Sequence, residues 1–298
     1  MSNLARTKAI KHHRDERPDL DQQMTFFEAL WDAQDEIAVQ AAAYTPADGD
    51  ATTRALDANQ TLFSLVTPTV PAGAYRDAVK KVADLMVEHA GLPDDQIAGL
   101  KDADLAAAIT DEALAEALDG FDVFIQAVVT KLDDERLTSP LLAYILQEAM
   151  VPFLREPATA AMAAAGKYDW MNWSSGLCPI CGTPASSAIV LDEGELQGGR
   201  RWLSCPTCRA KWEYARLRCV RCGSRDMKDL EYLYDESDPG HKIHTCKKCH
   251  GYLPVAFEKD LKIIGIPEVE EVVMVRLETV AAERGFTPLG DETAERPN

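Results

Sequence analysis

The sequence predicts an α+β, multidomain fold. An all-α N-terminal domain is expected to precede two tandem tetra-cysteine modules of the rubredoxin-like or zinc-ribbon kind and a C-terminal helix. Apolar residues recur at helical spacing, with almost no strand-like alternation, before residue 185. All eight cysteines lie between positions 178 and 249. The expected parts are a flexible tail at 1–20, a helical domain at 21–170, a first tetra-cysteine ribbon at 171–214, a second at 215–257, and a C-terminal helix and tail at 258–298.

The first twenty residues are polar, and their adjacent histidines, His12 and His13, are expected to be solvated rather than to bind a metal. A helix is expected from Asp21, because Phe27, Leu30 and other apolar residues recur in steps of three and four. Alanine and leucine dominate the segments that follow, and prolines separate them. Further helices are therefore expected at 52–66, 73–90, 102–117, 120–132 and 139–155.

The sequence changes character after Tyr168, where Cys, Gly and Arg become frequent and short β-prone runs begin. One amphipathic helix is expected later, at 268–284, with an apolar face that should dock on the rest of the protein. The expected strands are Ser187–Leu191, Arg201–Ser204, Trp212–Leu217, Leu230–Leu233 and Ile243–Thr245.

Every cysteine belongs to a Cys-x-x-Cys pair, and the first four cysteines map onto the second four by a constant shift of 41 positions. A two-residue gap lets both sulfurs point into one turn, and Gly182, Gly223 and Gly251 are placed to relax the turns that follow. Two facing pairs supply four thiolates, which suit zinc or iron. The sequence predicts two mononuclear sites, one held by Cys178, Cys181, Cys205 and Cys208 and the other by Cys219, Cys222, Cys246 and Cys249.

Three other uses of these cysteines fit less well. Structural disulfides rarely span two-residue gaps and are disfavoured in a reducing compartment. A thioredoxin-type dithiol opens a helix after a strand, which could explain one pair but not a fourfold repetition. An iron–sulfur cluster uses the same ligands but usually shows denser cysteine runs.

A tetrathiolate site has no open coordination position, so it stabilises a fold rather than activating water. The sequence contains no Ser-His-Asp arrangement, Walker loop, dinucleotide-binding glycine signature or His-Glu-x-x-His motif. The protein is therefore expected not to be an enzyme. The three histidines near the second site, His241, His244 and His250, are expected to lie at the surface or to support that site.

Basic and aromatic residues concentrate between the two predicted sites. Guanidinium groups and aromatic faces could hold an acidic or extended peptide of a partner protein. The same cations could instead offset the negative charge of the thiolate sites, and nucleic-acid binding is a third interpretation. The candidate partner-binding residues are Arg201, Trp202, Trp212, Arg216 and Arg218.

The net charge is −18, and residues 1–170 hold 14 Lys and Arg against 29 Asp and Glu. An acidic body repels phosphate backbones, so no nucleic-acid partner is expected. The start of the sequence lacks the apolar core of a signal peptide, and no apolar run reaches the length of a membrane span. A cytoplasmic protein without membrane contact is expected.

The segments Leu177–Pro184, Arg201–Cys208 and Cys246–Pro254, with Cys219 and Cys222 between them, resemble the formate dehydrogenase accessory protein family, FdhE. The resemblance is sharpest over 176–257. It implies a cytoplasmic factor with two rubredoxin-like metal sites, which can carry iron. It also implies binding to the molybdenum- or tungsten-containing catalytic subunit of formate dehydrogenase during maturation of that enzyme.

Two rival functions stay open at the level of sequence. A zinc-ribbon nucleic-acid-associated protein would use the basic strip between the sites, although the net charge argues against it. A rubredoxin-like one-electron carrier would require iron in the sites. The ligand set alone accepts either iron or zinc.

Overall fold

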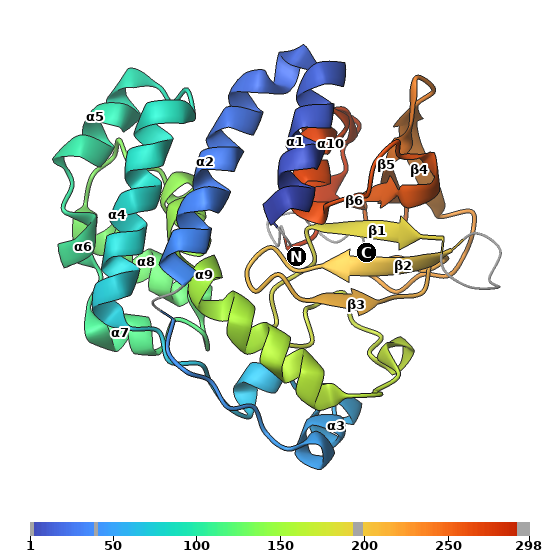
Figure 1. Cartoon of the computed structure of the whole chain (residues 1–298), viewed down its shortest axis with the longest axis horizontal. Coiled ribbons are helices and arrows are strands. Elements are labelled where there is room, and N and C mark those ends of the chain that lie inside the picture. Colours follow the sequence, from blue (N-terminus) through green and yellow to red (C-terminus); the bar gives the residue numbers. More distant parts are fainter. Residues whose placement is uncertain (1–2, 39–40, 193–198, 291–298) are drawn as a thin grey trace.

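The computed structural model describes residues 3–38, 41–192 and 199–290 (Figure 1). Helices make up the N-terminal half, and a single sheet with one covering helix follows. The α+β fold class is confirmed. The helices are α1 (Asn3–Glu16), α2 (Asp21–Ala38), α3 (Gly49–Asp57), α4 (Ala72–His89), α5 (Asp94–Asp102), α6 (Leu105–Ala108), α7 (Asp111–Ala115), α8 (Phe121–Leu132), α9 (Ser139–Ala165) and α10 (Pro267–Glu283).

The described strands all belong to one seven-stranded sheet. Three short 3-10 turns precede the strands, and one lies between β6 and β7. The strands are β1 (Ser187–Leu191), β2 (Arg200–Ser204), β3 (Lys211–Glu213), β4 (Leu230–Asp235), β5 (Asp238–Cys246), β6 (Gly251–Phe257) and β7 (Thr287–Pro288). The 3-10 turns are η1 (Pro18–Leu20), η2 (Leu62–Ser64), η3 (Trp170–Asn172) and η4 (Glu258–Asp260).

The helix α9 is the centre of the helical half, where it packs against α2, α4 and α8. It contains two buried prolines, Pro152 and Pro157, and it is longer than the sequence predicts because it continues beyond residue 155. Each proline removes one backbone N–H from the helical ladder. The apolar contacts along most of the buried length of α9 outweigh that loss, so the helix ends only at Ala165.

Two other predicted helices are shorter or divided. The segment 52–66 forms α3 followed by η2, and the segment 102–117 forms α6 and α7. The division has a local cause: Asp104 accepts a hydrogen bond from the Ala107 N–H (3.0 Å), and Thr110 accepts one from the Ala113 N–H (3.1 Å). Each side chain acts as an N-cap and starts a new helix. The helix α5 was not predicted.

The sheet joins the two ribbons. Its strand order is β3-β2-β1-β6-β5-β4, with β7 beside β6. The central pairing of β1 with β6 is parallel, with Ala188 opposite Val255, and the other pairings along the main path are antiparallel. The strand expected at Trp212–Leu217 is the shorter β3, and β6 was not predicted. The cysteine modules are therefore two halves of one sheet.

Residues 3–20 differ from the flexible tail that their polar composition predicts. Here α1 forms a helix that lies beside α10, as Figure 1 shows in dark blue and red. Ala9 and Ile10 are buried in one apolar cluster with Val269 and Val273 of α10. Only a few apolar side chains of α1 are needed for this contact. The composition of the segment is therefore polar even though the helix packs against the protein. The expected docking of the C-terminal helix on the rest of the protein is confirmed, since α10 packs against β1, β5 and β6.

One apolar core runs from the helices into the first ribbon. It includes Phe153 of α9, Ile180 beside the first cysteine pair, and Trp212 of β3, each fully buried. The burial of these side chains fixes the helical half against β3. Within the described ranges, none of the helices combines the length and apolar character that a membrane span requires.

Candidate metal centres

The first four cysteines converge on one point, as predicted. The Sγ atoms of Cys178 and Cys208 lie 3.5 Å apart, and those of Cys181 and Cys205 lie 3.4 Å apart. All four sulfurs lie within 4.8 Å of one another. Four thiolates around a tetrahedral zinc ion lie roughly 3.8 Å apart, whereas disulfide-bonded sulfurs lie about 2.05 Å apart. The geometry therefore fits a single thiolate-bound ion.

The second four cysteines repeat this arrangement. The Cys219 and Cys249 sulfurs are 3.6 Å apart, the Cys222 and Cys246 sulfurs are 3.7 Å apart, and the four lie within 4.8 Å of one another. All eight thiols are free of disulfides. The structure thus brings together both predicted ligand sets, and either zinc or iron fits them.

The turns that carry the cysteines share one backbone pattern. The N–H of Cys178 bonds to the carbonyl of Thr183 (2.8 Å), and the N–H of Cys219 bonds to the carbonyl of Ser224 (2.8 Å). In the first and third turns, Gly182 and Gly223 follow the second cysteine with left-handed φ values of 84° and 72°. The repeated hydrogen bonds show that the duplicated sequence unit builds the same first turn in both sites.

In the other two turns the left-handed residue is not glycine. Arg209 (φ 60°) follows Cys208, and His250 (φ 53°) follows Cys249, so the relaxing position is His250 and not the predicted Gly251. Residues with a Cβ adopt this conformation at a cost of roughly 1–2 kcal/mol. For Arg209, an ion pair with Glu148 offsets this cost.

Four neighbouring thiols cannot all ionise without a cation. Burial raises the pKa of Cys178 and of Cys208 well above the usual value, and adjacent sulfurs add to the shift in each. In the second site the hydrogen bond from Cys249 lowers the pKa of Cys219 to about 5, while burial raises that of Cys246 to about 11. A divalent ion supplies the positive charge that lets all four ligands stay thiolates.

The two sites differ in exposure. Cys178, Cys205 and Cys208 of the first site are at most 1% exposed, and Cys181 is half-buried. In the second site Cys222 is exposed and Cys249 is half-buried. The first site lies inside the continuous core, whereas the second reaches the surface.

The helical half supports the first site through its backbone. The N–H groups of Leu62 and Phe63 in η2 donate to the carbonyls of Pro179 and Ile180, both at 2.9 Å. Those carbonyls lie between Cys178 and Cys181. This contact fixes the first cysteine turn to the connection that leads from α3 to α4.

A buried polar link supports the other turn of the same site. Arg209, directly after Cys208, pairs with Glu148 of α9 at 3.2 Å, and Gln34 of α2 donates to the same Glu148 carboxylate at 2.8 Å. Burial by itself would lower the pKa of Arg209, but Glu148 and neighbouring carboxylates raise it. Glu148 therefore holds α2, α9 and the first ribbon together.

Replacing Glu148 with alanine is expected to lower the free energy of unfolding by about 2–4 kcal/mol, because it leaves the partly buried Arg209 guanidinium and the buried Gln34 amide without this carboxylate. Glu156, exposed on the same helix, provides the matched control, and its replacement with alanine should change stability by no more than about 0.5 kcal/mol. Thermal unfolding of the metal-loaded proteins measures both. Equal melting temperatures for the two variants would contradict the role of Glu148.

Two of the candidate partner-binding residues do not lie at the surface. Arg201 is 1% exposed and Trp212 is 0% exposed. The Arg201 guanidinium donates to the carbonyls of Ala215 and Arg218, the latter at 2.8 Å, and contacts Nδ1 of His244 at 3.0 Å. Burial lowers the pKa of Arg201 to about 10. Arg201 stabilises the segment that connects the two ribbons. Because Arg201 and Trp212 are both buried, the prediction that they contact a partner is wrong.

The other candidates and the nearby histidines occupy different positions. Trp202, Arg216 and Arg218 are half-buried, so part of each side chain faces solvent. His250 is exposed, whereas His244 is buried against Arg201. His241 is also buried and bonds to Glu270 of α10 rather than to either cysteine site.

Sequence reasoning found all eight cysteines but missed the residues that position them. Glu148 and Gln34 lie in predicted core helices, and no local motif distinguishes them from other polar residues there. The signal that could have found Glu148 is its place, as a charged residue, among the apolar residues of a predicted core helix, close to Leu146 and Ala149. Contact with Arg209, 61 residues later, depends on the fold.

The comparisons with known proteins agree in one family. The model named "FdhE, central domain" matches residues 177–216, which contain the first site. "Protein FdhE homolog" of Aquifex aeolicus is 28% identical over 164 residues, covering 54% of this chain and 55% of that protein. The protein of the same name in Stutzerimonas stutzeri is 31% identical over 159 residues, covering 47% of each. The chain thus matches about half the length of these curated relatives.

A solved structure extends the comparison to the whole chain. The crystal structure of the FdhE protein from Pseudomonas aeruginosa superposes with a TM-score of 0.60 at 17% identity, covering 99% of this chain and 93% of that one. At this identity the match shows a shared fold. Together with the central-domain match and the curated relatives, it shows that the chain is similar to FdhE proteins in sequence over about half of its length and in fold over nearly all of it.

Proposed function

We propose that the protein is a cytoplasmic maturation factor that binds the catalytic subunit of a molybdenum or tungsten formate dehydrogenase. The observation that carries the proposal is the pair of tetra-cysteine sites on one sheet, in a chain that is similar to FdhE proteins. The two metal ions fix the shape of the sheet, and the sheet presents a surface to the client enzyme. The partner follows from the family resemblance.

The chemistry of the sites supports a role without turnover. Each predicted ion has four sulfur ligands, so it offers no position for water or substrate. The ions supply folding free energy, on the order of 10 kcal/mol each. The residues of the sheet and not the ions then make the contacts with the partner.

The surface proposed for that contact lies between the ribbons. Leu217 is 56% exposed and stands between Arg216 and Arg218, whose side chains are half-buried. The Arg218 guanidinium lies over the ring of Tyr214, 5.6 Å from its centroid. An exposed apolar side chain with an arginine on either side of it in the sequence suits an extended segment that carries acidic residues. Trp202 remains a further candidate for the same surface.

Co-purification from cells that produce formate dehydrogenase tests this function. The wild-type protein is expected to retain the catalytic subunit, and Leu217→Asp is expected to reduce the retained amount at least tenfold. Val123→Asp is the matched control, because Val123 is another exposed apolar residue, 66% exposed, on α8. Capture should be unchanged in that variant, and both variants should keep their metal content.

Two results would count against the proposal, the first against the partner and the second against the contact surface alone. One is a wild-type protein that does not retain the catalytic subunit, together with normal formate dehydrogenase activity in a strain that lacks the protein. The other is equal capture by wild type and by Leu217→Asp, which would reject the contact surface while leaving the partner in place.

One observation favours a second candidate function, one-electron transfer of the rubredoxin kind. Cys222 is exposed, so an iron ion in the second site would lie close to a docked redox partner. This function requires iron and a visible absorption that bleaches reversibly on reduction. A protein isolated with zinc in both sites would retain only the scaffolding role.

A further inference from the structure

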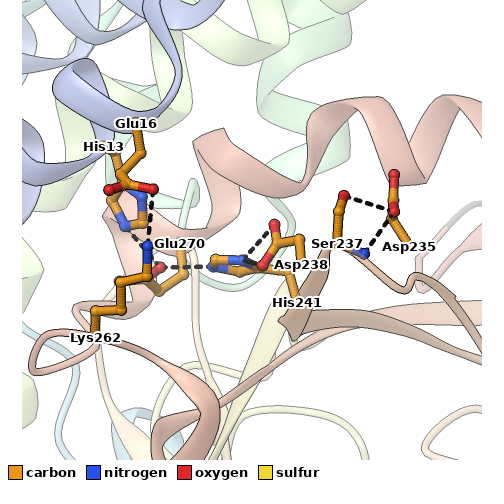
Figure 2. Close-up of polar contacts among 8 residues, drawn as sticks. All are labelled: His13, Glu16, Asp235, Ser237, Asp238, His241, Lys262 and Glu270. Atoms are coloured by element: carbon orange, nitrogen blue, oxygen red, sulfur yellow. Dashed lines mark hydrogen bonds and ion pairs between the residues drawn. The ribbon is translucent and has the colours of Figure 1, made fainter.

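A third cluster of metal-binding side chains lies apart from both cysteine sites. It consists of His13 in α1, His241 in β5 and Glu270 in α10, whose ligand atoms all lie within 4.8 Å of one another. The Nε2 atoms of His13 and His241 lie 3.0 and 2.8 Å from the same atom, Oε2 of Glu270. Figure 2 shows both imidazole rings directed at this carboxylate.

The cluster is buried, and the side chains are held in place from behind. His13 is 4% exposed, His241 is 3% exposed and Glu270 is 0% exposed. Nδ1 of His241 lies 2.8 and 2.9 Å from the two oxygens of Asp238, and Oε1 of Glu270 accepts a hydrogen bond from the Ile266 N–H at 3.1 Å. A histidine whose second nitrogen is fixed by a carboxylate is the usual arrangement around protein-bound metals.

We infer that His13, His241 and Glu270 form a third metal site, which takes one divalent transition-metal ion of the zinc class. Two imidazoles and one carboxylate are a common ligand set for such ions, with metal–ligand distances of about 2.0–2.2 Å. Ligand atoms around a tetrahedral ion then lie roughly 3.3 Å apart. The observed separations of 2.8 and 3.0 Å need to open by only a few tenths of an ångström.

The charges of the cluster fit a cation. The Glu270 carboxylate is fully buried, and a buried carboxylate needs positive charge or hydrogen-bond donors beside it. Glu270 supplies a carboxylate where the Nε2 atoms of His13 and His241 meet, and the partly exposed Asp238 holds the other ring nitrogen of His241. A metal ion would replace the protons that now join these groups.

The position of the cluster indicates what the metal would do. Its ligands come from the first helix, the sheet and the last helix, and His13 and Glu270 are 257 residues apart in the chain. The pair formed by Glu16 and Lys262, at 2.9 Å, lies beside the cluster in Figure 2, and both side chains are largely exposed. The site therefore lies close to the surface, and an ion in it would fasten α1 to α10 and β5.

Cobalt titration of the full-length protein tests the inference, with zinc already bound in both cysteine sites. Wild type is expected to bind one further Co²⁺ per chain, with visible ligand-field bands and without the charge-transfer absorption of a cobalt–thiolate site. His13→Ala and His241→Ala are expected to lose this third equivalent. His12→Ala is the matched control, because it removes the neighbouring histidine, which lies outside the cluster, and it should bind as wild type does.

A positioning variant keeps the test decisive if removal of a ligand disturbs folding. Asp238→Asn leaves all three ligands in place but weakens the support behind His241, so it should weaken Co²⁺ binding roughly 10- to 100-fold. Retention of two zinc ions per chain reports that each variant is folded. The inference is overturned if wild type binds no third equivalent, or if His13→Ala and Asp238→Asn both bind it as tightly as wild type.

Discussion

Replacing Cys178 with serine is expected to remove one metal ion per chain and to unfold the half of the sheet formed by β1, β2 and β3. Cys178 is fully buried, and its sulfur lies 3.5 Å from that of Cys208. Loss of a structural ion costs on the order of 10 kcal/mol, which is comparable to the whole stability of a typical domain. Elemental analysis and thermal unfolding, each relative to wild type, measure the two effects.

The comparison for this variant is Cys222→Ser in the second site. Cys222 is exposed and lies outside the core that the helices share with the first ribbon. This variant should also lose one ion, but the helical half and the first site should stay folded. A Cys178→Ser protein with the wild-type metal content and melting temperature would show that the first four cysteines do not hold an ion.

Replacing Arg201 with methionine is expected to lower the free energy of unfolding by about 2–4 kcal/mol. The substitution keeps a long apolar side chain but leaves the carbonyls of Ala215 and Arg218 without their donor. Removal of a buried charge offsets part of this loss, since burial already lowers the pKa of Arg201 to about 10. For a chain of this size the expected fall in Tm is roughly 5–10 °C.

The neighbouring Arg200 supplies the control for Arg201. Its side chain is 43% exposed, and it lies 3.5 Å from Glu213 across the strand pair. Such surface pairs contribute little, so Arg200→Met should change stability by no more than about 1 kcal/mol. If Arg201→Met unfolds at the same temperature as Arg200→Met, the buried guanidinium does not stabilise the connection between the ribbons.

The metal sites could be predicted from the sequence because their signal is local. Each Cys-x-x-Cys pair forms within one turn, and the shift of 41 positions assigns the pairs to two sites without knowledge of the fold. The helical half was also recognisable, since Val79, Val82 and Met86 of α4 repeat with helical period and are all buried.

The remaining features depend on contacts between distant residues. The pairing of Ala188 with Val255 joins two modules that the sequence presents as separate. An arginine looks the same in sequence whether its side chain is exposed, as that of Arg200 is, or buried, as that of Arg201 is. The cluster of His13, His241 and Glu270 has no local pattern, because each residue comes from a different element.

The position of β6 in the middle of the sheet has a consequence for folding during synthesis on the ribosome. All ligands of the first ion have been synthesised by residue 208, but the open edge of β1 receives its partner only with Gly251–Phe257. An unpaired edge strand readily pairs with other chains. During synthesis there is thus an interval in which the first ribbon can already bind its metal ion while β1 is still an unpaired edge strand. The interval ends when β6 has been translated and pairs with β1.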